Sequence, residues 1–168
     1  MKNPELEEAF NQSFLEYSYL MQGGAYFGAV SKLAEMENCL PLLSKGLQAK
    51  WREQISKEIL SEDVIRELKV EIEKAVEKIK RILSFGTKWQ YEELLLVWTI
   101  RIQIEMLLRF LSERHWLTER NFSLEDIDEA MLEVAKSKIN KQNLQIATNL
   151  MKKNWGLPIN SRWLENAS

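Results

Sequence analysis

Residues 89–115 read WQYEELLLVWTIRIQIEMLLRFLSERH and contain neither proline nor glycine. A helix drawn through this segment carries apolar side chains on nearly every side. Most helices of soluble proteins bury one apolar stripe, whereas a helix that is apolar almost all round needs neighbours on several sides. The segment therefore predicts a long central helix, at about residues 88–116, in an all-α protein.

The flanking sequence predicts further helices, because apolar residues recur in it at steps of three and four. Before the central helix, the expected helices cover about residues 4–22, 25–40, 41–60 and 62–85. After it, two more begin near 124 and 141. Ser61 is expected to cap the helix behind it, and Thr87 with Gln90 to form the capping box that opens the central helix. No run of alternating β-branched residues predicts a strand. The expected fold is a single-domain multi-helix bundle of about six or seven helices.

The bulk properties of the chain are those of an ordinary globular protein. Its 168 residues favour one domain, and its net charge of −2 provides no strong field to attract nucleic acid or anionic lipid. The single cysteine, Cys39, excludes an internal disulfide and favours a reducing compartment. The N-terminus carries acids where a signal peptide would be apolar, and residues 94–100, the longest uncharged stretch of the central segment, are far short of the ~20 residues of a membrane span. We expect a cytoplasmic protein with no membrane contact and one domain over 1–168, its tail at 157–168 docked through apolar residues.

Charge is distributed unevenly in the last third of the chain. Residues 117–135 hold six acids and one base, whereas residues 136–168 hold six bases and one acid. The total charge conceals these blocks, which can pair within the molecule or across a homodimer. Basic residues beside tryptophans are also typical of surfaces that contact the phosphates and bases of nucleic acids. The residues expected to contact a partner or a nucleic acid are Lys136, Lys138, Lys141, Lys152, Lys153, Trp155, Arg162 and Trp163.

Three charged residues form a polar stripe on the otherwise apolar central helix. Arg101, Glu105 and Arg109 follow one another at four-residue steps and lie at neighbouring helical angles. A buried arginine needs an anionic partner, so the favoured interpretation is a buried polar seam, a salt-bridge ladder between two packed helices. The alternative interpretation is a pocket in which Arg101 or Arg109 receives an anion from a ligand or a partner.

His115 is the only histidine and follows Arg109 by six residues. This spacing resembles the Arg-x(4–6)-His motif of the HEPN superfamily, small helical bundles that include ribonucleases. The resemblance implies a composite site in which Arg109 and His115 from two protomers cleave RNA, the arginine stabilising phosphorane charge and the histidine moving a proton. The family often has a polar residue directly after the arginine, where this chain has Phe110. The helical angle of His115 matches those of Val97 and Leu108 on the apolar face, so a packed histidine is favoured over a catalytic one.

A second resemblance lies near the N-terminus. The spacing of Gly24, Tyr26, Ala29, Leu33 and Pro41 is similar to the second half of a tetratricopeptide repeat. In that family, glycine and tyrosine form the turn between two helices and alanine lets the helices approach. The chain shows no second copy at a period of ~34 residues, and such repeats need neighbours to be stable. An ordinary helical hairpin with the same turn chemistry is therefore the favoured interpretation.

Other classes of site find no support in the sequence. One histidine and one cysteine cannot build a typical zinc site, so no metal ligand is expected. No glycine-rich phosphate loop, EF-hand loop or Gly-x-Ser-x-Gly elbow is found, and no cofactor is expected. The expected function is that of a non-enzymatic interaction protein, a small subunit or regulator of a larger protein or nucleoprotein complex. The alternative is a HEPN-like ribonuclease that uses Arg109 and His115.

Overall fold

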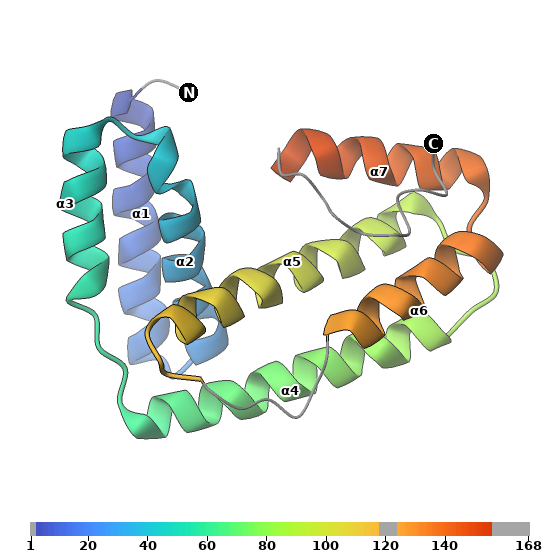
Figure 1. Ribbon diagram of the computed structural model, residues 1–168, viewed down its shortest axis with the longest axis horizontal. Helices are drawn as coiled ribbons and strands as arrows, with labels where there is room; N and C mark the ends of the chain where they lie inside the picture. Colours follow the sequence, from blue (N-terminus) through green and yellow to red (C-terminus); the bar gives the residue numbers. More distant parts are fainter. Residues whose placement is uncertain (1–2, 118–123, 156–168) are drawn as a thin grey trace. The chain divides into compact units, whose positions relative to one another are not determined.

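The computed structural model describes residues 3–117 and 124–155, with the side chains of 4–117 and 124–153 (Figure 1). The described residues form seven α-helices and no strand. In chain order the helices are α1 (Asn3–Gln22), α2 (Tyr26–Cys39), α3 (Lys45–Ser56), α4 (Glu62–Ser84), α5 (Tyr91–Glu113), α6 (Leu124–Ser137) and α7 (Lys141–Trp155), with a 3-10 turn, η1 (Leu40–Leu42), between α2 and α3. The predicted all-α helical bundle is confirmed.

Helix α5 is the segment from which the fold was predicted, and most of its surface is buried. Its buried apolar residues occur on every side of the helix, as the sequence pattern requires. They are Leu94, Val97, Trp98, Ile102, Ile104, Met106, Leu107, Leu108, Phe110 and Leu111. The helix is a little shorter than expected, beginning at Tyr91 and ending at Glu113.

Polar side chains define where several helices begin. Ser61 caps α4 as predicted, because its Oγ accepts a hydrogen bond from the Val64 amide at 3.2 Å. The capping box predicted for Thr87 and Gln90 is wrong, because α5 begins only at Tyr91. In its place, the Gln90 amide donates to Glu93 Oε1 at 3.3 Å, which is one of the two hydrogen bonds of a capping box.

The chain divides into two compact units, one of residues 1–72 and 103–119 and one of residues 73–102 and 120–168. In the first unit α1, α2 and α3 lie side by side (Figure 1). Aromatic contacts join α1 to α3, since the Trp51 ring centroid lies 5.5 Å from that of Phe10 and 6.1 Å from that of Phe14. One domain over 1–168 stays a prediction, and the tail at 157–168 lies outside the described residues.

In the second unit, the turn before α5 is tied to the turn after α6. The Trp89 amide donates to the Lys138 carbonyl at 2.7 Å, and the Lys138 ammonium donates to the Leu83 carbonyl at 2.8 Å. Carbonyls at the end of a helix lack partners within the helix, so the lysine satisfies one that α4 leaves open. Lys138 therefore has a structural role within this unit.

Candidate functional site

Arg101 lies in the interior of the second unit. The residue is 8% exposed, and its Nε and Nη2 donate to the two carboxylate oxygens of Asp128 on α6 at 2.8 and 2.9 Å. Its guanidinium carbon also lies 5.3 Å from the Trp98 ring centroid. A bidentate pair is the strongest form of an arginine–carboxylate ion pair, so Arg101 stabilises the seam between α5 and α6. The seam predicted at Arg101 exists, but the sequence stripe does not contain its anion, Asp128.

Arg109 has the opposite environment within the first unit. Its side chain is 60% exposed, and its Nη2 lies 3.8 Å from Glu105 Oε1 on the same helix. Arg109 lies eight residues, roughly 12 Å, further along α5 than Arg101, so it has different neighbours. The prediction of a buried seam is therefore correct at Arg101, whereas Glu105 is half-buried and the prediction is wrong at Arg109.

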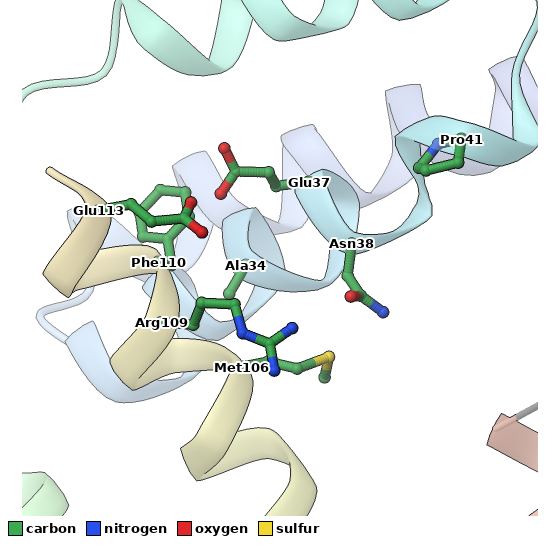
Figure 2. A pocket seen from close by; sticks show the side chains of 8 residues that line it. All are labelled: Ala34, Glu37, Asn38, Pro41, Met106, Arg109, Phe110 and Glu113. Atoms are coloured by element: carbon green, nitrogen blue, oxygen red, sulfur yellow. The ribbon is translucent and has the colours of Figure 1, made fainter. Parts of the chain in front are cut away.

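Arg109 lines a pocket of about 230 Å³ between α2 and α5, shown in Figure 2. In this view its guanidinium points across the pocket toward the side where Asn38 lies, with Ala34 above it and Met106 below. Part of the wall is therefore apolar, and the guanidinium and the amide supply hydrogen-bond donors. The remaining lining residues are Glu37, Pro41, Phe110 and Glu113.

Arg114, which the sequence analysis did not single out, neutralises one of the acids of this pocket. Its Nη1 and Nη2 donate to the two carboxylate oxygens of Glu37 at 3.1 and 2.8 Å. Its guanidinium carbon stacks 3.7 Å from the Phe110 ring centroid. The only sequence signal for this site was Phe110, four residues before Arg114, which predicts the stacking contact. It did not predict the carboxylate partner on α2.

His115 occupies a position that glycine normally takes. At the end of α5 the Trp116 amide donates to the Leu111 carbonyl, and the His115 amide donates to the Ser112 carbonyl, each at 3.0 Å. This is the Schellman pattern of helix ends, in which the residue before the last donor adopts a left-handed backbone. His115 has a φ of 58°, whereas α1 ends in the same pattern with Gly24 at a φ of 78°.

The prediction that His115 packs on the apolar face of the helix is wrong, because the helix ends before it. With a left-handed backbone the residue no longer follows the helical angle, and it is exposed. It lines a pocket of about 440 Å³, the His115 pocket, made of Glu62, Ile65, Arg66, Lys69, His115, Trp116 and Leu117. Arg109 lines the pocket between α2 and α5, so neither of these two pockets holds both residues of the HEPN-like motif. A composite site built from two chains stays a prediction.

An apolar groove of the described surface lies on α1. Leu15 is 65% exposed and Tyr19 is 77% exposed. They line a groove of about 500 Å³ together with Gln12, Glu16 and Leu20, which we call the α1 groove. Phe10 and Tyr17 occupy the buried side of the same helix. Leu15 and Tyr19 lie about half a turn round α1 from Phe10, so helical spacing places them on the opposite side of the helix.

The residues of the predicted basic surface have different environments. Lys138 is half-buried and bonded to the end of α4, whereas the exposed lysines are Lys136, Lys141, Lys152 and Lys153. The side chain of Trp155, and all of Arg162 and Trp163, lie outside the described residues. Two acids of the neighbouring acidic block bind bases of α4 and α5, since Asp126 Oδ2 lies 3.5 Å from Lys80 Nζ and Asp128 binds Arg101. Pairing of the acidic block with the basic block stays a prediction.

Burial changes the titration of three side chains in the first unit. Burial raises the pKa of the Tyr17 phenol, and the nearby charge of Glu58 raises it further. The Tyr17 hydroxyl donates to Glu58 Oε2 at 3.0 Å, so the phenol serves as a neutral donor. Burial also raises the pKa of the Glu35 carboxyl and of the Cys39 thiol. A thiol with a raised pKa holds little thiolate at neutral pH, so Cys39 is a poor nucleophile.

Neither a metal-binding cluster nor a membrane-spanning helix is found within residues 3–117 and 124–155. Among these residues, no group of three or more His, Cys, Asp or Glu side chains could hold a metal ion. No helix of the described ranges is both long and apolar enough to cross a membrane.

Comparison with protein families, curated proteins and solved structures finds no match for this chain. The HEPN and tetratricopeptide resemblances therefore rest on the short motifs quoted above. Any function has to be argued from the surfaces of the molecule itself.

Proposed function

We propose that the protein is a helical interaction subunit of a larger protein or nucleoprotein complex, and that the α1 groove binds its protein partner. The observation that carries this proposal is the exposure of Leu15 and Tyr19, at 65% and 77%, on neighbouring turns of one helix. Large apolar side chains that gather in a groove on a soluble protein mark interaction sites, whereas scattered ones need no explanation.

The chemistry of the groove favours an amphipathic helix as the partner element. Leu15 and Tyr19 are four residues apart and therefore stand on one face of α1, which suits apolar side chains inserted at the same spacing. Glu16 at the edge is already held, because its carboxylate binds Lys32 at 3.0 Å and Gln12 at 3.5 Å. Tyrosine is also a residue type that often carries much of the binding energy at interfaces.

The groove is tested with the double variant Leu15→Glu/Tyr19→Glu. A tagged chain purified under native conditions from its own cells is expected to bring one stoichiometric partner, measured by native mass spectrometry. The double variant is expected to lose that partner while keeping its circular dichroism spectrum and melting temperature. Tyr19→Ala alone is expected to weaken binding roughly 30-fold.

Ile59→Glu is the matched control, because Ile59 is also a large exposed apolar residue, at 82%, but does not line the groove. The control is expected to retain the partner. A complex that survives the double variant overturns the α1 groove as the docking surface. A chain that elutes alone in every preparation overturns the proposal as a whole.

The nucleoprotein part of the proposal is supported by the exposure of Lys136, Lys141, Lys152 and Lys153. When lysines bind the phosphates of a nucleic acid, they release the counterions held there, and added salt opposes this release. The affinity for a single-stranded RNA should therefore fall steeply as the salt concentration rises. Lys152→Glu/Lys153→Glu is expected to weaken binding and to flatten its salt dependence, measured by fluorescence anisotropy. Lys78→Glu, an exposed lysine on α4, is the control. If RNA affinity changes neither with salt concentration nor in the Lys152→Glu/Lys153→Glu variant, these lysines do not contact nucleic acid.

A further inference from the structure

We infer that the His115 pocket binds the phosphate group of a small phosphate monoester. This inference is independent of the proposed function, because the pocket shares no residue with the α1 groove. It also differs from the HEPN-like interpretation, because Arg66 and Lys69, and not Arg109, are the cations beside His115.

Two short segments form the pocket. On α4, both Ile65 and Arg66 lie three or four residues from Glu62 and from Lys69, which places these side chains on one face of the helix. The turn after α5 supplies His115, Trp116 and Leu117. Two cationic side chains and an imidazole thus line one pocket of about 440 Å³.

The nitrogen donors of this pocket are available to a ligand. Among the described residues, neither the Lys69 ammonium nor the His115 ring makes a hydrogen bond or ion pair. Arg66 Nη1 binds Asp63 at 3.0 Å, but these side chains are 72% and 84% exposed, so the pair contributes little stability. A phosphate can therefore take the place of Asp63 at small cost and gain charge-assisted hydrogen bonds.

The backbone of His115 supports a role for its side chain. A left-handed backbone is unfavourable for a residue with a Cβ, and glycine would close this turn without strain. Histidine at this position keeps an imidazole at the pocket in spite of that strain, and strained residues cluster at functional sites.

The remaining lining residues define the rest of the ligand. A volume of about 440 Å³ is larger than a phosphate ion needs, and Ile65, Trp116 and Leu117 supply apolar wall. Glu62 is the one carboxylate of the lining, and it suits a hydroxyl donor of the ligand. The ligand class is therefore a phosphate monoester with a ring-bearing organic part, for which adenosine monophosphate is a suitable probe.

The single histidine makes the test direct. The chain contains one His, so its imidazole Cε1–H gives one assignable proton resonance. At constant pH and ionic strength, inorganic phosphate and adenosine monophosphate are each expected to shift this resonance saturably, and adenosine is not. Equal affinities for phosphate and adenosine monophosphate would show that the pocket contacts only the phosphate group. Tighter binding of adenosine monophosphate would show that the pocket also contacts the organic part.

Variants then assign the contacts by titration calorimetry with adenosine monophosphate. Arg66→Met/Lys69→Met is expected to weaken binding at least tenfold, because charged hydrogen bonds are lost. Lys78→Met, an exposed lysine of the same helix outside the pocket, is expected to change it less than twofold. His115→Gly is expected to weaken binding several-fold without unfolding the chain, since glycine suits this backbone. The inference is overturned if adenosine binds as tightly as its phosphate, if sodium chloride alone reproduces the shift, or if the double variant binds normally.

Discussion

The two halves of α5 place similar arginines in opposite environments. Arg101 in the first half is 8% exposed and forms a bidentate ion pair with Asp128. Arg109 in the second half has a side chain that is 60% exposed. A buried guanidinium has lost its hydration, so its charge must be stabilised by its ion-pair partner. An exposed guanidinium stays hydrated, so its charge needs no ion-pair partner. Burial of the charge, more than its position in the sequence pattern, therefore decides how much each arginine contributes to stability.

Removing the partner of Arg101 should have the largest effect. Asp128→Ala leaves a buried guanidinium without its carboxylate, and we expect a loss of about 3 kcal/mol in the free energy of unfolding, measured by urea denaturation. Asp126→Ala is the control on the same helix, because the Asp126 side chain is 58% exposed in its pair with Lys80. The control should cost less than 1 kcal/mol.

The double variant Arg101→Met/Asp128→Leu sharpens this result. Replacing both charges by apolar side chains removes the unpaired buried charge, so at least half of the loss should be recovered. Equal losses in Asp128→Ala and Asp126→Ala would contradict the contrast between buried and exposed pairs.

Arg114→Ala should have the next largest effect, because its pair with Glu37 is partly buried, with side chains 20% and 29% exposed. We expect a loss of about 2 kcal/mol, from two charged hydrogen bonds and the stacking on Phe110. Arg81→Ala on the exposed side of α4 is the control and should change stability by less than about 0.5 kcal/mol. A loss in Arg114→Ala no larger than in the control would show that Glu37 and Phe110 do not hold this side chain in solution.

His115→Gly should stabilise the protein by about 1 kcal/mol, measured as a higher melting temperature. The variant relieves the left-handed backbone strain of His115, and the gain is reduced by the greater freedom of glycine in the unfolded chain. Gly24→Ala tests the reciprocal change, since Gly24 has a φ of 78° and open space around its missing Cβ. It should destabilise the protein by about 1 kcal/mol, and an unchanged melting temperature in both variants would contradict the assigned helix ends.

Arg109→Ala should have the smallest effect, within about 0.5 kcal/mol in the free energy of unfolding. Its long contact with Glu105 at 3.8 Å is exposed and therefore contributes little. A loss above 1 kcal/mol, measured by the same urea denaturation, would show that Arg109 holds α2 against α5 and would remove the contrast with Arg101.

Much of the fold could be predicted because helix signals are local. The spacing of apolar residues located all seven helices, and the Ser61 cap was correct because a cap acts within one turn. The start of α5 was predicted wrongly at Thr87 because local spacing alone was ambiguous there. Thr87 with Gln90 and Gln90 with Glu93 are both three residues apart, so either pair fits the spacing of a capping box.

The candidate sites were harder to predict because their residues come from distant segments. His115 and Arg109 were identified as a motif, but the partners that line the His115 pocket come from α4, about fifty residues earlier in the chain. Helical spacing places Leu15 and Tyr19 on the side of α1 opposite Phe10, but it did not show that this side would stay exposed and form a groove.

The sequence by itself determined the helices, their approximate ends and the all-α class, because these depend on hydrogen bonds and side-chain spacing within a few residues. Only the tertiary structure decided which charges are buried, which partner each arginine finds and which apolar side chains stay exposed. Those outcomes depend on desolvation and packing between segments far apart in the chain, as the pairing of Arg101 with Asp128 and the exposure of Tyr19 show.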